Sequence, residues 1–474
     1  MTFTSLEFGI FLNVVFVLYW FVFDKKTKEQ NILILIASYV FYGWWDWRFL
    51  ILIFISSMTD YIIGQFLEKT EQTSKRKWLL YTSIFVNLGI LFTFKYFGFF
   101  VDSFKAIFNI SNHPSFLTLD LILPVGISFY TLQTLSYTID VYDKKLKASH
   151  DFVSFFAYVS FFPQLVAGPI ERATNLLPQF TKERSFSYEK ANDGMRQILW
   201  GLFKKMVVAD HCGAYADDII ANWDVHSGST LLVGLIVATF RFYCDFSGYS
   251  DIAIGTGRLF GFKLSKNFDF PFFSRNVSEF WNKWHITLIE WFRFYIVNKL
   301  KGYTKIKITR NIFVVFLITG LWHGAAWKYI VWGLLHAVTF LPMIYGKRKK
   351  IRHTVAKGKL LPSLTELYQM TKTYMIFTLV GTFFVADTVV SGGGILQKVF
   401  SLSIFSMPSL PNRYVFIGIT SLLIVEWLQR EKEHGLEIKS DAISLPLRWG
   451  IYFFLFLFIL IFGANVNPFT YFQF

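Results

Sequence analysis

The chain has 474 residues, of which 54% are hydrophobic, 20% aromatic and only 17% charged. A soluble globular protein carries about 25% charged residues, so this composition excludes an ordinary soluble domain and indicates an integral membrane protein. Lys and Arg exceed Asp and Glu by 47 to 32, which gives a net charge of +15. In a membrane protein that excess is typical of cytoplasmic loops, and no patch of the sequence favours nucleic-acid binding.

Apolar stretches recur along the whole chain, and several approach the roughly 20 residues that a helix needs to cross a bilayer. The shorter ones are expected to be half-spans or re-entrant segments, which must be covered by protein or line a cavity. We predict a single domain over residues 1–474, with apolar stretches at 6–23, 31–45, 49–67, 78–98, 118–139, 151–168, 195–209, 230–248, 311–322, 326–345, 370–388, 413–429 and 446–463.

The basic loops predict the orientation in the membrane. The N-terminal sequence MTFTSLEFG holds Glu7 and no basic residue, so we expect a retained first helix whose N-terminus lies outside. Loops 24–30, 68–77 and 347–359 are rich in Lys and Arg and are expected in the cytoplasm. Counting the remaining spans places the C-terminus outside, whereas residues 145–300 leave the topology ambiguous.

The stretch GLWHGAAW, residues 320–327, places His323 at the end of an apolar run that follows a basic loop. About 12 helical residues rise about 18 Å, so His323 is predicted to lie deep in the membrane and to be reached from the cytosol. Gly320 and Gly324 would permit close backbone approach or a helix break. A packed histidine is the alternative, but ionisable groups inside a bilayer are costly and usually functional. Neutral histidine can take a proton from a hydroxyl near pH 7.

The stretch EFWNKWHITLIEWFRFY, residues 279–295, predicts an amphipathic helix that lies in the membrane interface. Asn282 and His285 are three residues apart and would share one face of that helix. Incidental polar residues on a surface helix would give the same pattern.

Asp245 and Asp251 follow an apolar span in FYCDFSGYSDIAIG, residues 242–255. They line a polar cavity or cap a helix end, and capping is the commoner role. Two further segments, 123–142 and 161–172, are interrupted by Pro and Gly and are expected to line a cavity. The two cysteines are too far apart in sequence for a disulfide framework or a zinc pattern, so no metal site is predicted.

Four motifs in this order, FFPQLVAGPIER, FYCDFSGYSDIAIG, FWNKWHITL and GLWHGAAW, together resemble the membrane-bound O-acyltransferase (MBOAT) family. The branch that they resemble is the bacterial alginate O-acetyltransferase type, and the likeness runs from about residue 30 to the end. It implies an all-α polytopic membrane protein of about 11–13 transmembrane or re-entrant helices around a central funnel. A cytosolic acyl thioester would meet there an acceptor that approaches from outside.

The resemblance also implies roles for individual residues. The family's essential histidine corresponds to His323, which follows Trp322 and would act as general base or proton shuttle. The second family histidine corresponds to His285, placed near the cytoplasmic mouth to position or protonate the donor. The family often has arginines where this chain reads Asn282-Lys283, which argues against a catalytic role for Asn282.

The C-terminal sequence NPFTYFQF, with Phe469, Tyr471, Phe472 and Phe474, matches an F-x-Y-F-type motif of bacterial O-acylation systems similar to this one. The motif implies that residues 465–474 form an acyl relay, in which Tyr471 accepts the acyl group and passes it to an extracytoplasmic SGNH-type transferase. A histidine base can help to ionise a phenol of pKa about 10, and the phenyl ester stays activated for transfer. An aromatic anchor in the interface is the alternative.

We therefore predict an acyltransferase of a bacterial cytoplasmic membrane that uses acetyl-CoA, or another acyl thioester, as co-substrate and binds no cofactor. Its final acceptors would be hydroxyls of an exported polysaccharide or cell-wall glycan. One alternative is a D-alanyl transferase of the teichoic-acid type, which takes its acyl group from a carrier protein. The others are a glycan or lipid transporter without chemistry and a scaffold for polysaccharide export.

Overall fold

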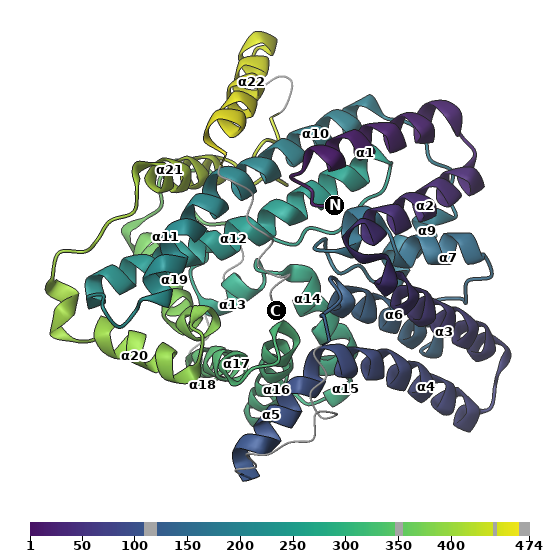
Figure 1. The fold of residues 1–474 in the computed structure, drawn as a ribbon, viewed down its shortest axis with the longest axis horizontal. Helices are drawn as coiled ribbons and strands as arrows, with labels where there is room; N and C mark the ends of the chain where they lie inside the picture. The colour runs from purple at the N-terminus through teal and green to yellow at the C-terminus, as the bar shows by residue number, and fades with distance from the viewer. Residues whose placement is uncertain (109–120, 347–353, 439–442, 464–474) are drawn as a thin grey trace. The chain divides into compact units, whose positions relative to one another are not determined.

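The computed structural model describes residues 1–108, 121–346, 354–438 and 443–463, and every regular element in these ranges is a helix (Figure 1). Helices satisfy all their backbone hydrogen bonds internally, which the bilayer core requires. In the described ranges, six helical runs are long and apolar enough to span a membrane: Thr27–Lys69, Thr73–Phe108, Gly228–Leu259, Lys305–His323, Trp327–Tyr345 and Leu445–Phe462. The predicted all-α polytopic fold class is confirmed.

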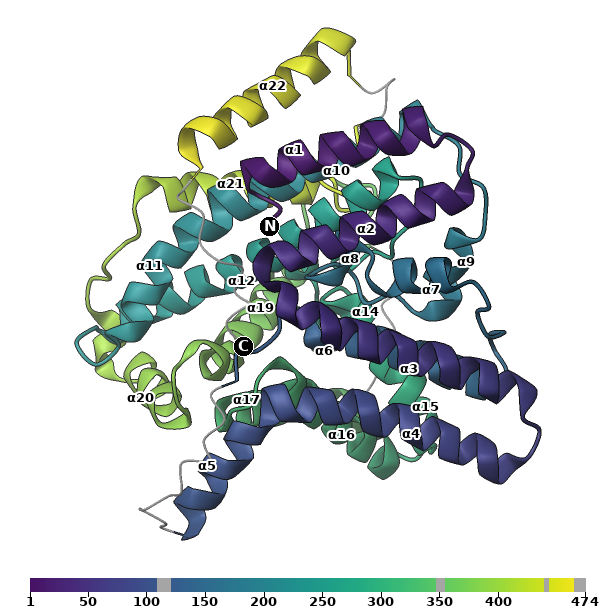
Figure 2. The ribbon, with the colours of Figure 1, turned by 45° about the vertical axis from the view of Figure 1, so that its right-hand side comes forward.

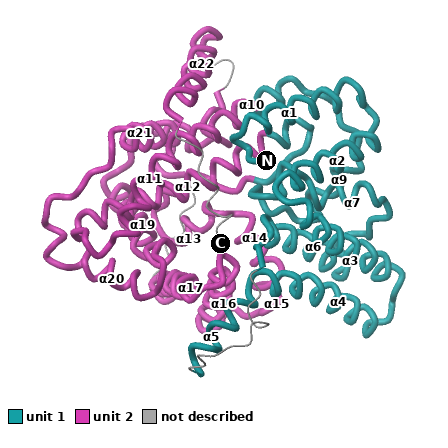
Figure 3. The backbone as a smooth tube through the Cα atoms, viewed as in Figure 1, with its two compact units in different colours: residues 1–194, 256–265 teal, residues 195–255, 266–474 magenta. Residues whose placement is uncertain are grey.

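The chain divides into two compact units (Figure 3). Unit 1 comprises residues 1–194 and 256–265, and unit 2 comprises residues 195–255 and 266–474. Each unit is described by itself below.

Unit 1 contains the N-terminal helices, of which α3 and α4 run side by side (Figure 2). Their polar side chains meet those of α6: Asp60 is fully buried and accepts hydrogen bonds from Thr138 at 2.9 Å and Asn87 at 2.9 Å. The helices of this unit are α1 (Leu6–Val17), η1 (Leu18–Val22), α2 (Thr27–Asp46), η2 (Trp47–Phe49), α3 (Leu50–Lys69), α4 (Thr73–Leu91), η3 (Phe92–Tyr96), α5 (Phe97–Phe108), α6 (Ile127–Tyr142), α7 (Phe152–Val159), α8 (Phe162–Leu165) and α9 (Ala173–Phe180).

Unit 2 holds the long helix α12 and the hairpin of α16 and α17 that carries His323. The chain passes between the units within α10 (Tyr188–Leu202), within α12 (Gly228–Leu259) and at residues 265–266. The other helices of unit 2 are η5 (Phe203–Ala209), α11 (Asp210–Ala221), η6 (Pro271–Phe273), α13 (Val277–Trp281), α14 (Ile286–Phe292), η7 (Arg293–Val297), α15 (Asn298–Leu300), α16 (Lys305–His323), α17 (Trp327–Thr339), α18 (Leu341–Tyr345), α19 (Leu364–Val385), α20 (Val389–Val399), η8 (Leu402–Phe405), α21 (Arg413–Leu428) and α22 (Leu445–Phe462).

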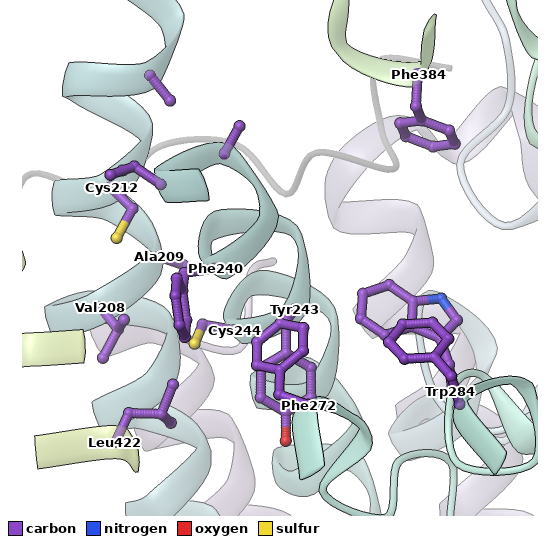
Figure 4. Close-up of a cluster of buried hydrophobic side chains, with 14 of the residues drawn as sticks. Val208, Ala209, Cys212, Phe240, Tyr243, Cys244, Phe272, Trp284, Phe384 and Leu422 are labelled. Carbon is purple, nitrogen blue, oxygen red and sulfur yellow. The ribbon is translucent and has the colours of Figure 1, made fainter. Parts of the chain in front are cut away.

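The core of unit 2 is an aromatic cluster beside α12 (Figure 4). The ring of Phe272 lies 4.7 Å from that of Tyr243 and 5.1 Å from that of Phe240, between ring centroids. Cys212 and Cys244 are free thiols buried in the same cluster. Trp332 and Phe384 belong to the same cluster, and rings packed at such distances and angles stabilise one another.

Candidate functional site

His323 is the last residue of α16. The helix begins at Lys305, where the hydroxyl of Thr304 accepts a hydrogen bond from the Lys307 amide at 3.3 Å. At 19 residues it is longer than the segment of about 12 residues expected from the apolar pattern alone. The basic residues that precede the apolar run therefore belong to the same helix, and α16 is a full span in length.

Two glycines allow α17 to pack closely against the end of α16. A Cβ atom on Gly320 would overlap the carbonyl oxygen of Tyr329, and one on Gly324 would overlap the ring of the same tyrosine. Gly333 on α17 meets the carbonyl oxygen of Phe316 in the same way. The close approach expected from the glycines in GLWHGAAW is present, and it places His323 inside a tight hairpin.

Aromatic rings enclose the imidazole of His323, which is 4% exposed. Its centroid lies 5.1 Å from the Trp322 ring, 5.1 Å from the Trp332 ring and 5.2 Å from the Phe384 ring of α19. All three contacts are edge-on. This enclosure excludes water, which strengthens any polar interaction made inside it.

His285 lies between two short helices and not on one long helix. The expectation of one interfacial helix over 279–295 is wrong, because α13 ends at Trp281 and α14 begins at Ile286. His285 itself has left-handed backbone angles, φ 46° and ψ 50°, which cost a residue with a Cβ atom about 1–2 kcal/mol. The turn directs Trp284 and His285 into unit 2, where they are 7% and 1% exposed.

A hydrogen bond to a buried asparagine holds the imidazole of His285. Its Nδ1 lies 3.0 Å from Oδ1 of Asn267, which also accepts a hydrogen bond from Thr287 Oγ1 at 2.9 Å. The amide nitrogen of Asn267 donates to Ser250 Oγ at 2.9 Å. Nε2 of His285 has no hydrogen-bond partner among the described residues. Burial lowers the pKa of His285 to about 3, so the ring is neutral at physiological pH.

Trp322 connects the two predicted histidines. Its ring lies 5.1 Å from that of His323 and 5.6 Å from that of His285, between centroids. The opposite side of His285 is covered by Phe246 of α12 at 4.6 Å. Two residues that are far apart in sequence thus share one tryptophan in one buried cluster.

Asp245 and Asp251 lie in the middle of α12, so neither caps a helix. Asp245 pairs with Lys205 at 2.8 Å, and Asp251 pairs with Lys204 at 2.6 Å. Lys205 also pairs with Asp210 at 2.8 Å. Buried charges need such partners, because desolvation of an unpaired ion is expensive.

A small polar hollow lies on this charged side of α12. Asn267 belongs both to its lining and to the hydrogen bonds of His285, so the hollow and the histidine cluster meet at one side chain. The lining residues are Trp200, Lys204, Tyr243, Ser247, Ser250, Asp251, Ile254, Lys266, Asn267, Phe268, Phe270, Glu426, Glu433, His434 and Gly435. Of the two aspartates, Asp251 lines the hollow. Lining a polar cavity was one of the two roles expected for these residues.

Comparison with known proteins identifies the family of the chain. A sequence model described as "MBOAT, membrane-bound O-acyltransferase family" matches residues 143–348, which include both histidines. The protein named "Peptidoglycan O-acetyltransferase" of Helicobacter pylori is 34% identical over 371 residues, 71% of this chain and 68% of that relative. The chain belongs to the membrane-bound O-acyltransferase family.

Two other MBOAT relatives differ in name and in coverage. The "Probable alginate O-acetylase" of Pseudomonas aeruginosa is 38% identical over 333 residues, 69% of this chain and 63% of that relative. The chain thus spans less than two thirds of that protein. The "Teichoic acid D-alanyltransferase" of Bacillus subtilis is 29% identical over 243 residues, 48% of this chain and 60% of that relative.

Several residues of this MBOAT site were not predicted from the sequence. Lys204 and Lys205 stand in η5, a π-helical segment inside an apolar stretch, and ionisable residues in such a stretch are themselves a signal. His336 of α17 is 1% exposed, with its ring 4.9 Å from Trp332 and 5.0 Å from Trp281. It lies four residues after Trp332, on the same helix face, in a run without any recognisable motif.

Other predicted residues lie apart from the cluster or outside the described residues. Asn282 is exposed at the end of α13, where its Oδ1 accepts a hydrogen bond from Arg293 at 3.3 Å. The tail, with Phe469, Tyr471, Phe472 and Phe474, falls in residues 464–474, which the structure does not describe. Among the described residues, no three His, Cys, Asp or Glu side chains are grouped so that they could hold a metal ion.

Proposed function

We propose that this chain is a membrane O-acyltransferase that moves an acetyl group from acetyl-CoA across the membrane to hydroxyls of an exported polysaccharide or cell-wall glycan. The observation that carries the proposal is the aromatic enclosure around His323, which Trp322 links to His285. The names of the Pseudomonas and Helicobacter relatives support an acetyl group and a glycan acceptor.

In the proposed reaction, His323 accepts the proton of an acceptor hydroxyl while the hydroxyl oxygen attacks the thioester carbonyl carbon. The carbon–sulfur bond then breaks, and the imidazolium returns the proton to the leaving thiolate. Atoms and charge balance without a cofactor. Proton transfer to a general base positioned in this way accelerates the reaction about 10²–10⁴-fold.

His285 is proposed to position the donor. Its neutral ring, held at Nδ1 by Asn267, offers the Nε2 lone pair as a hydrogen-bond acceptor. An amide N–H of the pantetheine arm of the donor is a suitable partner. Protonation of the donor, the other role considered, would need an imidazolium that a pKa of about 3 does not supply.

Tyr471 is proposed as the first acceptor, which passes the acetyl group to an extracytoplasmic SGNH-type transferase. The sequence FTYFQF supports this step, because flanking phenylalanines can seat a tyrosine in an apolar mouth. The proposed location is the cytoplasmic membrane of a bacterium, with both termini outside.

The test is to incubate the purified full-length protein with isotope-labelled acetyl-CoA and to measure thioester loss and the mass of the C-terminal peptide. We expect label on Tyr471, and loss of both signals by at least about 10²-fold in His323→Ala. His150→Ala is the matched control, since His150 is an exposed histidine of unit 1 paired with Glu68. Tyr471→Phe should lose the label.

Each other outcome selects another function. Thioester loss that depends on His323 but leaves the tail unlabelled would keep the enzyme and make the tail an anchor. Transfer that needs an aminoacylated carrier protein would favour the D-alanyl transferase, which the Bacillus subtilis relative supports. Glycan movement that survives His323→Ala would indicate a transporter, and O-acetylation that survives it in cells would indicate a scaffold.

A further inference from the structure

Asn267 lines the polar hollow and is hydrogen-bonded to His285. It is completely buried, and it stands in a segment without helix between α12 and η6. Its backbone carbonyl accepts a hydrogen bond from the Ile286 amide at 2.9 Å, which fixes the start of α14. Backbone and side chain of one residue therefore hold both the helix and the imidazole that precedes it.

The Asn267 amide has Oδ1 on the side of His285 and Nδ2 on the side of Ser250. Oδ1 faces two groups, Nδ1 of His285 at 3.0 Å and Oγ1 of Thr287 at 2.9 Å. An amide oxygen has two lone pairs and can accept from both. Nδ2 faces Ser250 Oγ at 2.9 Å, and a hydroxyl can accept that hydrogen bond. With Oδ1 turned toward His285, the proton of the neutral imidazole must be on Nδ1.

We propose that Asn267 is a positioning residue for the acyl transfer: it holds His285 as the tautomer protonated on Nδ1, so that Nε2 keeps its lone pair for the thioester donor. This inference rests on the proposed function for its consequence, although the tautomer itself does not. A neutral imidazole without such a partner exchanges between two tautomers, and only one of them leaves Nε2 as an acceptor. Without Asn267 the site would be correctly arranged for only part of the time.

Two substitutions separate this role from packing. Asn267→Leu keeps the volume and removes the acceptor, and we expect kcat/KM for acetyl-CoA to fall about 10–100-fold, with a rise in KM because the contact to the donor is lost, as for other residues that orient a functional histidine. Asn267→Asp keeps the acceptor oxygen, and kcat/KM should stay within about fivefold of wild type. Asn311→Leu is the matched control, because Asn311 is a buried asparagine of unit 2 that accepts from Arg310.

The pH dependence of kcat/KM gives a second test of this role. The rings packed on His285 are those of Phe246 from α12, Phe268 and Trp322 from α16, none of which titrates. A carboxylate introduced by Asn267→Asp would stabilise the imidazolium, so the acid limb of kcat/KM should move to higher pH than in wild type. Asn311→Leu should leave that limb in place.

The tautomer is measured directly by ¹⁵N NMR of protein labelled at histidine, with the His285 signals identified from a His285→Gln sample. We expect a protonated Nδ1 and a bare Nε2 in wild type, and a mixture in Asn267→Leu. The same tautomer in both samples, or an unchanged kcat/KM in Asn267→Leu, would overturn the proposal. If wild type consumed no thioester, the proposed function would fail, while the NMR result would still decide the role of Asn267.

Discussion

At the residue scale, the site depends on histidines that are buried. For His285, the ring contacts that the structure describes are aromatic, and the ring is hydrogen-bonded at Nδ1 to a neutral amide. Desolvation favours the uncharged form, and among the described residues no carboxylate counteracts it. The residue is therefore a permanent acceptor near pH 7 and not a pH switch.

This burial predicts a pH dependence of stability. The unfolded pKa of His285 is about 6.5 and the folded pKa about 3, so the unfolded state binds more protons below pH 6.5. Stability is complete above pH 6.5 and is lost as the pH falls toward 3. At pH 5 the cost is about 2 kcal/mol. Equilibrium unfolding in mixed micelles should show wild type losing about that much more than His285→Gln between pH 7 and 5. Parallel curves would contradict the assignment.

At the element scale, the close packing of the α16–α17 hairpin depends on glycines, which have no side chain. Gly320, Gly324 and Gly333 each occupy a point where a Cβ atom would overlap the neighbouring helix. Small residues at helix contacts let backbones approach closely, which matters in a membrane because lipid is as apolar as the core. The histidine at the end of α16 is placed by this contact.

We predict that Gly320→Ala moves the two helices apart and lowers stability by about 1–3 kcal/mol, the usual cost of overpacking. Acyl transfer should fall with it, because His323 lies on the next turn. Gly381→Ala is the matched control, since Gly381 of α19 has open space around it and alanine is the better helix former. Melting temperatures and rates of the two variants check this, and equal effects would contradict it.

The charged pairs beside η5 give a second prediction for an element. Lys205 is 1% exposed and faces both Asp210 and Asp245. Lys205→Met leaves two buried carboxylates without their cation and should cost about 3–5 kcal/mol. Lys145→Met removes a pair whose lysine side chain is 54% exposed and should cost at most about 1 kcal/mol. Chemical unfolding of both variants measures the difference, and restoring stability with Asp245→Asn in Lys205→Met would confirm the cause.

The apolar pattern predicted helices and spans well, because every backbone group in a bilayer must be bonded within its own helix. It did not predict the break at residues 282–285, since no Gly or Pro marks the turn and the left-handed His285 is held by contacts with Asn267. Nor could it pair Lys204 with Asp251, because such partners are far apart in sequence and meet only in the fold. The role of the glycines in GLWHGAAW could be predicted, because glycine in an apolar helix indicates close packing against a neighbouring helix.

At the scale of the whole molecule, the distribution of basic residues predicts which loops face the cytoplasm. The charge pattern predicts the loop before α16 inside and the segment between α19 and α21 outside. Both native cysteines are fully buried, so the wild-type chain should not react with a thiol reagent that does not cross membranes.

We predict that Tyr303→Cys reacts with such a reagent only after the cells are permeabilised, whereas Leu402→Cys reacts in intact cells. Tyr303 is 96% exposed and Leu402 is 87% exposed, so access to each depends on its side of the membrane. Wild type is the control and should stay unlabelled. The reverse pattern would invert the orientation, and with it the side from which the thioester enters.

The left-handed backbone of His285 has a practical consequence for engineering this protein. Glycine and asparagine adopt φ near 46° at less cost than histidine does, and strain of this kind is of the order of 1–3 kcal/mol. A selection for thermostability alone would therefore replace His285 with one of them and discard the imidazole. Screens for thermostable variants should keep histidine at position 285, since a strained backbone is retained only where the imidazole ring is needed.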